Sequence, residues 1–303
     1  MKKLLYLIIC SVLTSFGAAA SDKVWNVNSD GDTIWYDINK ETKTAEVSEN
    51  RSYSGSIVIP QEIKVKRKTY RVTGVSRYAF FYCNKLKSVT MPSGLSSIGS
   101  SAFAGCRNLE QLTIPESVTS IGEKAFDGCS SLRNIQVSEA NQNYCSVDGV
   151  LYDKSKETLI MVFQNGISKF VIPESVTTIE DNAFKDCQNL TNIVIPNSVK
   201  KIGRWAFEGC KSLTNVVIPE GVTEIEYATF SGCQSLANIS IPASVKQIGG
   251  DVLKGCDRLE SIKVSDGAPS IVRKRIIKDF DKVYYPENFV VPFTEIVHDR
   301  ASV

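Results

Sequence analysis

Histidine is almost absent from this sequence. The chain has 303 residues and one histidine, His298, close to the C-terminus. Nucleophilic catalysis by serine or cysteine usually needs a histidine base, and zinc sites usually take histidine or a Cys-x-x-Cys pair, which the sequence also lacks. The GxSxG, HExxH, phosphate-loop and dinucleotide-binding motifs are missing too. We therefore expect a protein that is not an enzyme and has no catalytic residue, no cofactor and no metal.

Excess charge and long apolar runs are lacking as well. Lys2 and Lys3 precede an apolar stretch from Leu4 to Phe16, and three alanines end at position 20, a pattern typical of a signal peptide over residues 1–20. Its removal leaves 35 − 2 = 33 basic against 33 acidic residues, so the mature chain has no basic footprint for nucleic acid. No later apolar run reaches the roughly 20 residues of a membrane helix. We expect an exported chain without a transmembrane segment.

Seven cysteines follow a strict period. The spacing is 23 residues from Cys83 to Cys129 and again from Cys187 to Cys256. A large apolar residue lies three positions before each of these cysteines, a leucine lies three positions after it, and most copies continue with a β-rich run that ends in proline. A fixed period of this size indicates a stacked repeat array, in which each repeat completes the core of its neighbours.

The repeat can be written VTxIGxxAFxGCxxLxxIxIPxS, and it resembles the leucine-rich repeat of the BspA type found in bacterial surface proteins. The resemblance covers roughly residues 55 to 264. It implies a β-rich repeat solenoid, in which each LxxIxI segment supplies one strand of a parallel sheet on one face, with short helical turns or irregular segments on the other. It also implies adhesion to a host matrix protein or to a bacterial surface protein.

The pattern predicts four segments. Residues 1–20 are the signal peptide, 21–71 an N-terminal cap, 72–264 the solenoid with a hairpin insertion at 138–170, and 265–303 a C-terminal cap. In the N-terminal cap, apolar residues around Asp30-Gly31 favour a hairpin over a calcium loop. In the insertion, residues 143–152 and 158–162 predict two strands joined by a turn at 153–156.

The mature chain keeps eight of the nine cysteines, and export raises the alternative of disulfides between neighbouring coils. We favour unpaired buried thiols, because cysteine occupies a small, apolar, inward position in every repeat. Cys145 lies outside the period, within the insertion. A thiol-dependent enzyme centred on Cys145 is disfavoured, because His298 is the only histidine that could act as its base.

The alternation within LxxIxI directs two columns of side chains to the open face of the sheet. This face is small, polar, nearly uncharged and free of aromatic rings, so it suits a protein surface better than a sugar. Its asparagines either hydrogen-bond one another along the array or serve a ligand. The candidate ligand-binding residues are Gln111, Thr113, Asn134, Gln136, Asn192, Asn215, Asn238, Ser240 and Lys263.

Arg204 and Trp205 form a second candidate contact. Trp205 occupies the position before the Ala-Phe pair, which differs from repeat to repeat and is therefore expected to face solvent.

The sequence therefore predicts an exported protein at the cell surface or in the medium that binds other proteins. A structural or periplasmic scaffold that binds a partner without adhesion is the alternative.

Overall fold

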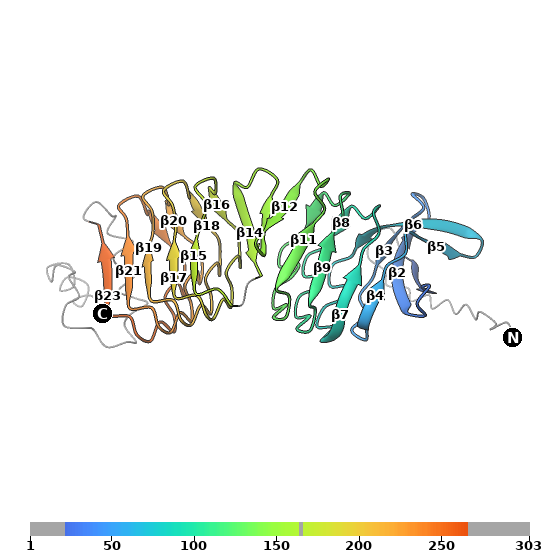
Figure 1. The fold of residues 1–303 in the computed structure, drawn as a ribbon, viewed down its shortest axis with the longest axis horizontal. Coiled ribbons are helices and arrows are strands. Elements are labelled where there is room, and N and C mark those ends of the chain that lie inside the picture. The colour runs from blue at the N-terminus through green and yellow to red at the C-terminus, as the bar shows by residue number, and fades with distance from the viewer. Residues whose placement is uncertain (1–21, 164–165, 266–303) are drawn as a thin grey trace, which may run out of the picture. The chain divides into compact units, whose positions relative to one another are not determined.

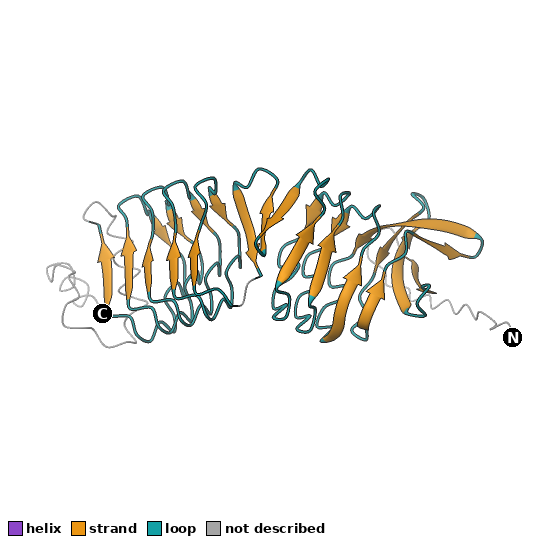
Figure 2. Cartoon of the chain, in the orientation of Figure 1, coloured by secondary structure: helices purple, strands orange, loops and turns teal. Residues whose placement is uncertain are grey.

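The computed structural model describes residues 22–163 and 166–265, in which the regular structure consists of strands joined by turns, without a helix (Figures 1 and 2). The described residues form two compact units, divided between residues 154 and 155. Strands and turns alone connect one coil to the next in each unit. Of the two alternatives expected for the far side of the coils, short helical turns or irregular segments, the described residues show no helix there, but short strands and turns.

The first unit begins with a small antiparallel arrangement. β1 (Asp22–Val27) pairs with β2 (Thr33–Asn39), which pairs with β3 (Thr44–Val47). Trp25 lies opposite Trp35, and the Asn28 side chain accepts hydrogen bonds from two backbone amides of the turn, those of Asp30 and Asp32. The hairpin predicted around Asp30-Gly31 is confirmed. A second hairpin, β5 (Glu62–Val65) with β6 (Lys68–Val75), was not anticipated.

The repeats of the first unit form two parallel ladders. The wide sheet has the order β4 (Ser54–Val58), β7 (Lys85–Thr90), β9 (Gln111–Ile114) and β11 (Asn134–Val137). The narrow ladder joins β6, β8 (Ser97–Ile98) and β10 (Ser120–Ile121). Since β4 pairs in parallel with β7, the parallel sheet already begins within the segment expected to be a cap.

One hairpin closes the first unit. β12 (Tyr144–Val147) and β13 (Val150–Asp153) are antiparallel. The turn residues Asp148 and Gly149 have φ angles of 47° and 71°, as a two-residue Asp-Gly hairpin turn requires. The predicted turn at 153–156 is confirmed, because turn residues 154–156 lie between β13 and the next strand, β14 (Thr158–Val162). The turn at Asp148-Gly149, which divides residues 143–152 into two strands, was not predicted.

The second unit repeats the two-ladder plan. Its wide sheet runs β15 (Lys169–Val171), β17 (Asn192–Val194), β19 (Asn215–Val217), β21 (Asn238–Ile241) and β23 (Ser261–Val264). Its narrow ladder runs β14 (Thr158–Val162), β16 (Thr178–Ile179), β18 (Lys201–Ile202), β20 (Glu224–Ile225) and β22 (Gln247–Ile248). The predicted parallel sheet of LxxIxI strands is confirmed.

Between the two ladders lies a column of stacked phenylalanines. The ring centroids of Phe80 and Phe103 are 4.9 Å apart and nearly parallel. In the second unit, Phe207 lies 4.9 Å from Phe184 and 5.3 Å from Phe230. All five rings are fully buried. Within each unit, neighbouring coils therefore stack one ring on the next and form an apolar core that no single coil could form alone.

The periodic cysteines line the same core. The eight cysteines of the described residues are free thiols, and the seven periodic ones are buried, so the prediction of unpaired buried thiols is confirmed. Cys106 donates its thiol to the carbonyl of Phe80 in the preceding coil, with Sγ 2.9 Å from the oxygen. Cys129, Cys210, Cys233 and Cys256 repeat this bond. The thiol is therefore also a polar link between coils.

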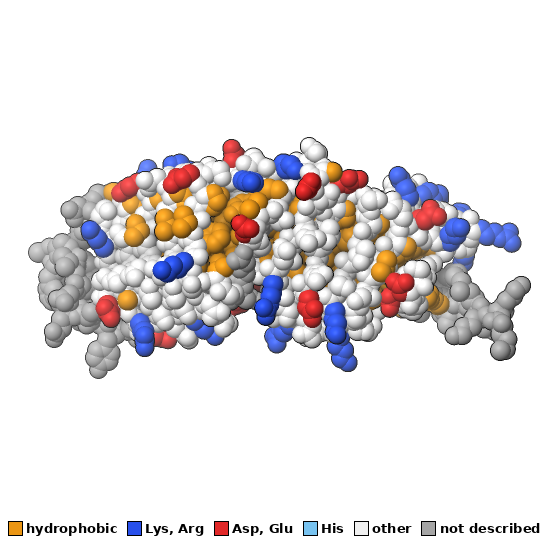
Figure 3. Space-filling view, viewed as in Figure 1, with side chains coloured by type: hydrophobic (Ala, Val, Ile, Leu, Met, Phe, Trp, Pro, Cys, Tyr) orange, Lys and Arg blue, Asp and Glu red, His pale blue; other side chains and the backbone are white. Residues whose placement is uncertain are grey.

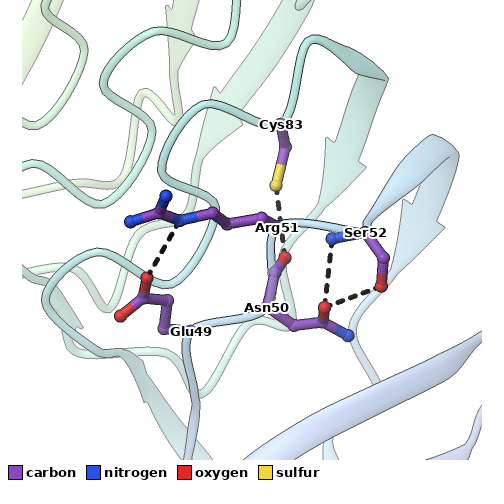
Figure 4. Close-up of polar contacts among 5 residues, drawn as sticks. All are labelled: Glu49, Asn50, Arg51, Ser52 and Cys83. Atoms are coloured by element: carbon purple, nitrogen blue, oxygen red, sulfur yellow. Dashed lines mark hydrogen bonds and ion pairs between the residues drawn. The ribbon is translucent and has the colours of Figure 1, made fainter.

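Figure 4 shows the thiol hydrogen bond of the first coil, where the series of bonds between coils ends. Cys83 has no preceding repeat to bond, and its thiol donates instead to the carbonyl oxygen of Asn50, 3.3 Å away. The Asn50 side chain accepts hydrogen bonds from the backbone amide and hydroxyl of Ser52, which fixes the loop. The loop around Asn50 therefore supplies the carbonyl acceptor that a preceding coil supplies to the other periodic cysteines.

Candidate functional site

A polar groove lies over β9 and β11 in the first unit. Gln111 and Thr113 point outward from β9, and in register beside them Asn134 and Gln136 point outward from β11; all four side chains are exposed. The groove has a volume of about 560 Å³. The strands therefore bring together four of the candidate residues that the sequence predicted. Its lining is completed by Glu110, Leu112, Ser131 and Arg133.

The side chains of this polar groove are available for binding. Those of Gln111, Thr113, Asn134 and Gln136 form no hydrogen bond with any residue that the structure describes. Glu110 and Arg133 flank the groove at the same end of the two parallel strands, and neither has an ion-pair partner among the described residues. Sequence reasoning missed these two charges, although their spacing of 23 residues places them in the same column.

In the equivalent column of the second unit, neighbouring side chains hydrogen-bond to one another. Asn238 donates to Asn215, with Nδ2 2.8 Å from Oδ1, and Ser261 donates its hydroxyl to Asn238 at 2.6 Å. We call these three residues the amide ladder. The Asn192 side chain accepts a hydrogen bond from Thr191. Of the two alternatives for the asparagine column, mutual hydrogen bonding therefore describes the amide ladder, whereas the polar groove keeps its groups free.

The neighbouring column of the second unit is apolar. Val171, Val194 and Val217 form a stripe on which the side chains are 68%, 55% and 68% exposed. Figure 3 shows apolar atoms gathered over the strands of the second unit, whereas the surface over β7, β9 and β11 is mostly polar. The stripe gives way to half-buried Ser240 and exposed Lys263. The description of the face as small and polar therefore does not hold for this column, and Val171 was not among the outward residues predicted.

Arg204 and Trp205 lie in a turn between the two ladders. Trp205 is half-buried and packs edge-to-face on exposed Tyr227, with ring centroids 5.6 Å apart. Arg204 forms an ion pair with Glu226 at 3.4 Å. Tyr227 donates its hydroxyl to Asp251, and this hydrogen bond raises the pKa of the Tyr227 phenol. Neither Tyr227 nor these pairings followed from the sequence reasoning.

The position of Trp205 has a backbone explanation. The residue before each Ala-Phe pair, or its equivalent, has a left-handed backbone with φ between 53° and 62°. At this position Asn182 and Ala228 are buried, at 2% and 3% exposure. We had expected this position to face solvent because its residue differs from repeat to repeat. In at least two coils it is buried instead.

The surroundings of Cys145 do not favour the hypothesis of a thiol-dependent enzyme. The residue is half-buried, and its thiol donates to the carbonyl of Asp153 at 3.3 Å. His298 lies outside the described residues. Nowhere in residues 22–163 and 166–265 do three or more His, Cys, Asp or Glu side chains gather as metal ligands. Across the same residues no helix is long and apolar enough to span a membrane.

Parallel strands, stacked apolar columns and turns of constant length define this protein as a leucine-rich-repeat solenoid. The family described as "BspA type Leucine rich repeat region" matches residues 56–147 and 162–276, in six copies. Since the match covers well over half of the chain, the chain belongs to the BspA-type leucine-rich repeat family.

A solved bacterial structure shares the fold. The pneumococcal vaccine antigen PcpA is similar at 20% sequence identity with a TM-score of 0.57, over 82% of this chain and 83% of that one. A leucine rich cell surface protein from Faecalibacterium prausnitzii is similar at 22% identity with a TM-score of 0.49, over 85% of this chain and 98% of that one. No curated protein is a significant match.

Proposed function

We propose that the chain is exported and binds another protein, at the cell surface or after secretion, through the polar groove of β9 and β11. The observation that carries the proposal is the contrast between two equivalent columns. Gln111, Thr113, Asn134 and Gln136 have no hydrogen-bond partner among the described residues, whereas Asn215 and Asn238 of the amide ladder bond one another.

The chemistry of the polar groove fits a polypeptide. Each glutamine or asparagine amide offers a donor and an acceptor, as does each peptide group of a partner. The outward residues Asn134 and Gln136 are two positions apart on an extended strand, which is also the repeat of an extended partner segment. No aromatic ring lines the groove, so the stacking that sugar sites commonly use is missing there.

The proposed export and adhesion are supported by the likeness of residues 1–20 to a signal peptide and of the fold to a bacterial antigen. Residues 1–20 have the pattern of a signal peptide. A solved structure of the same fold is that of a pneumococcal vaccine antigen. Adhesion to a host matrix protein or to another bacterium is the specific form of the binding that we propose.

Protease treatment of intact producing cells tests the location. Loss of the chain while a periplasmic marker survives, or recovery of the chain in the medium, supports exposure to the outside. Protection of the chain together with the marker would instead favour the alternative of a periplasmic scaffold, and would rule out adhesion.

A groove variant tests the binding site. Purified chain lacking residues 1–20 is applied to wells coated with extracellular-matrix extract or with whole bacterial cells. Gln111→Ala, Asn134→Ala and Gln136→Ala combined remove about three hydrogen bonds, each contributing about 0.5–1.5 kcal/mol, so a roughly hundredfold loss of affinity is expected.

The amide ladder supplies the matched control. Asn215→Ala combined with Asn238→Ala removes the same kind of side chain from the same column in the second unit, and binding should persist. Equal loss in both variants, or in neither, would count against the polar groove as the binding site.

A further inference from the structure

The first coil carries aromatic residues at two positions where the other coils have none. Its turn reads Tyr78-Ala-Phe-Phe-Tyr-Cys83. We call Tyr78, Phe81 and Tyr82 the aromatic patch. The residues equivalent to Phe81 are Ala104, Asp127, Lys185, Glu208, Ser231 and Lys254, and those equivalent to Tyr82 are Gly105, Gly128, Asp186, Gly209, Gly232 and Gly255.

The backbone at Tyr82 opposes an aromatic side chain. Tyr82 has a φ angle of 56°, and Gly105 and Gly128, its equivalents, have φ angles of 76° and 69°. This left-handed conformation suits glycine and is an outlier for a bulky residue. Such outliers persist where the surrounding structure holds them, and they cluster at functional sites. Tyrosine at this position therefore needs a reason beyond the turn.

Packing of the core does not supply that reason. The end of the phenylalanine column is covered by Tyr53, whose ring lies 4.8 Å from that of Phe80. Tyr82 remains 50% exposed. Its ring lies over Gly105, where an added Cβ would be 2.8 Å from Cδ1 of the tyrosine, and it meets Phe81 edge-on at 4.5 Å. One side of a fixed ring is therefore left open to solvent.

Two guanidinium groups border the aromatic patch. Arg77 lies 4.5 Å above the ring of Tyr78 and donates to its hydroxyl at 2.7 Å. Arg77 is exposed and pairs with no carboxylate among the described residues. Arg51 lies 5.6 Å from the ring centroid of Phe81 and forms an ion pair with Glu49 at 3.3 Å, which Figure 4 shows. The unpaired cation beside the rings is therefore Arg77.

We propose that the aromatic patch and Arg77 form a binding site for an acidic saccharide. The apolar face of one sugar ring would lie on the open side of Tyr82, and a carboxylate of the same saccharide would accept hydrogen bonds from the planar guanidinium of Arg77. The size of the patch favours a sugar over a protein. A specific protein interface covers about 800 Å² on each partner, more than one exposed and two half-buried rings provide.

The repeat itself supplies the test variants. Phe81→Ala with Tyr82→Gly gives the first coil the residues found at Ala104 and Gly105, so the fold should be kept and the melting temperature should not fall. Arg77→Gln removes the cation alone. Arg107→Gln removes an exposed cation from the next coil of the first unit and serves as the matched control.

The experiment measures binding of the chain lacking residues 1–20 to an array of neutral, uronic-acid-bearing and sialylated oligosaccharides. We expect acidic members to bind, the double variant to lose this binding, Arg77→Gln to weaken it by roughly tenfold to a hundredfold, and Arg107→Gln to leave it unchanged. Binding to neutral members alone, binding that the variants do not alter, or no binding to any member would overturn the proposal. Loss of protein capture, rather than of sugar binding, in the double variant would likewise overturn it.

Discussion

At the scale of single residues, burial controls the chemistry of the cysteines. Burial raises the pKa of the Cys106 thiol, and likewise that of Cys187, to about 12, and the thiolate is the reactive form. Cys145 is half-buried and lies outside the array. In the folded chain lacking residues 1–20, we expect Ellman's reagent to modify Cys145 alone, and after unfolding all eight remaining cysteines. In a Cys145→Ser control the folded chain should not react, and fast reaction of a further thiol would contradict the buried array.

The same thiols make stability depend on pH. The pKa of Cys106 rises from 9.0 to about 12 on folding, so above pH 9 the unfolded chain loses a proton that the folded chain keeps. The stabilisation is therefore complete below pH 9 and is lost as the pH rises towards 12, at about 1.4 kcal/mol per pH unit for each such thiol. Urea unfolding of the wild type and of Cys106→Ala through this range measures the effect. The variant should lose stability less steeply, and equal slopes would contradict the assignment.

At the scale of the structural element, the phenylalanine column connects one coil to the next. Phe207 contacts rings on both sides, at 4.9 and 5.3 Å. We expect Phe207→Ala to lower the free energy of unfolding by about 3–5 kcal/mol, because it leaves a cavity and interrupts the column. Lys211→Ala, at an exposed position of the same coil, should change it by less than about 0.5 kcal/mol. Urea denaturation followed by circular dichroism compares the two variants, and similar effects would argue against the column as the main support.

Repetition also explains what the sequence could predict. Each core column recurs in several copies, so the strands, the buried leucines and the outward direction of Gln111 and Asn134 followed from the period. The Asp148-Gly149 turn occurs outside the repeats, and a single copy offers no column with which to check its register. Which amides pair was not predictable either. The amide ladder joins asparagine to asparagine at strand spacing, whereas the polar groove mixes side chains of different lengths, and the side-chain geometry that separates them is not encoded in the period.

At the scale of the whole molecule, the two proposed binding sites differ in charge, so their binding should respond differently to salt. The chain without residues 1–20 has 33 basic and 33 acidic residues, so no net field steers a partner, and the four outward residues of the polar groove are uncharged. We expect protein binding through this groove to change less than threefold between low and high salt. Sugar binding at Arg77 should weaken clearly, because exposed charge pairs are screened by salt. Binding assays at both salt concentrations with the groove and aromatic-patch variants measure this difference. A steep salt dependence of protein binding would mean that Glu110 and Arg133, rather than the amides, dominate the groove.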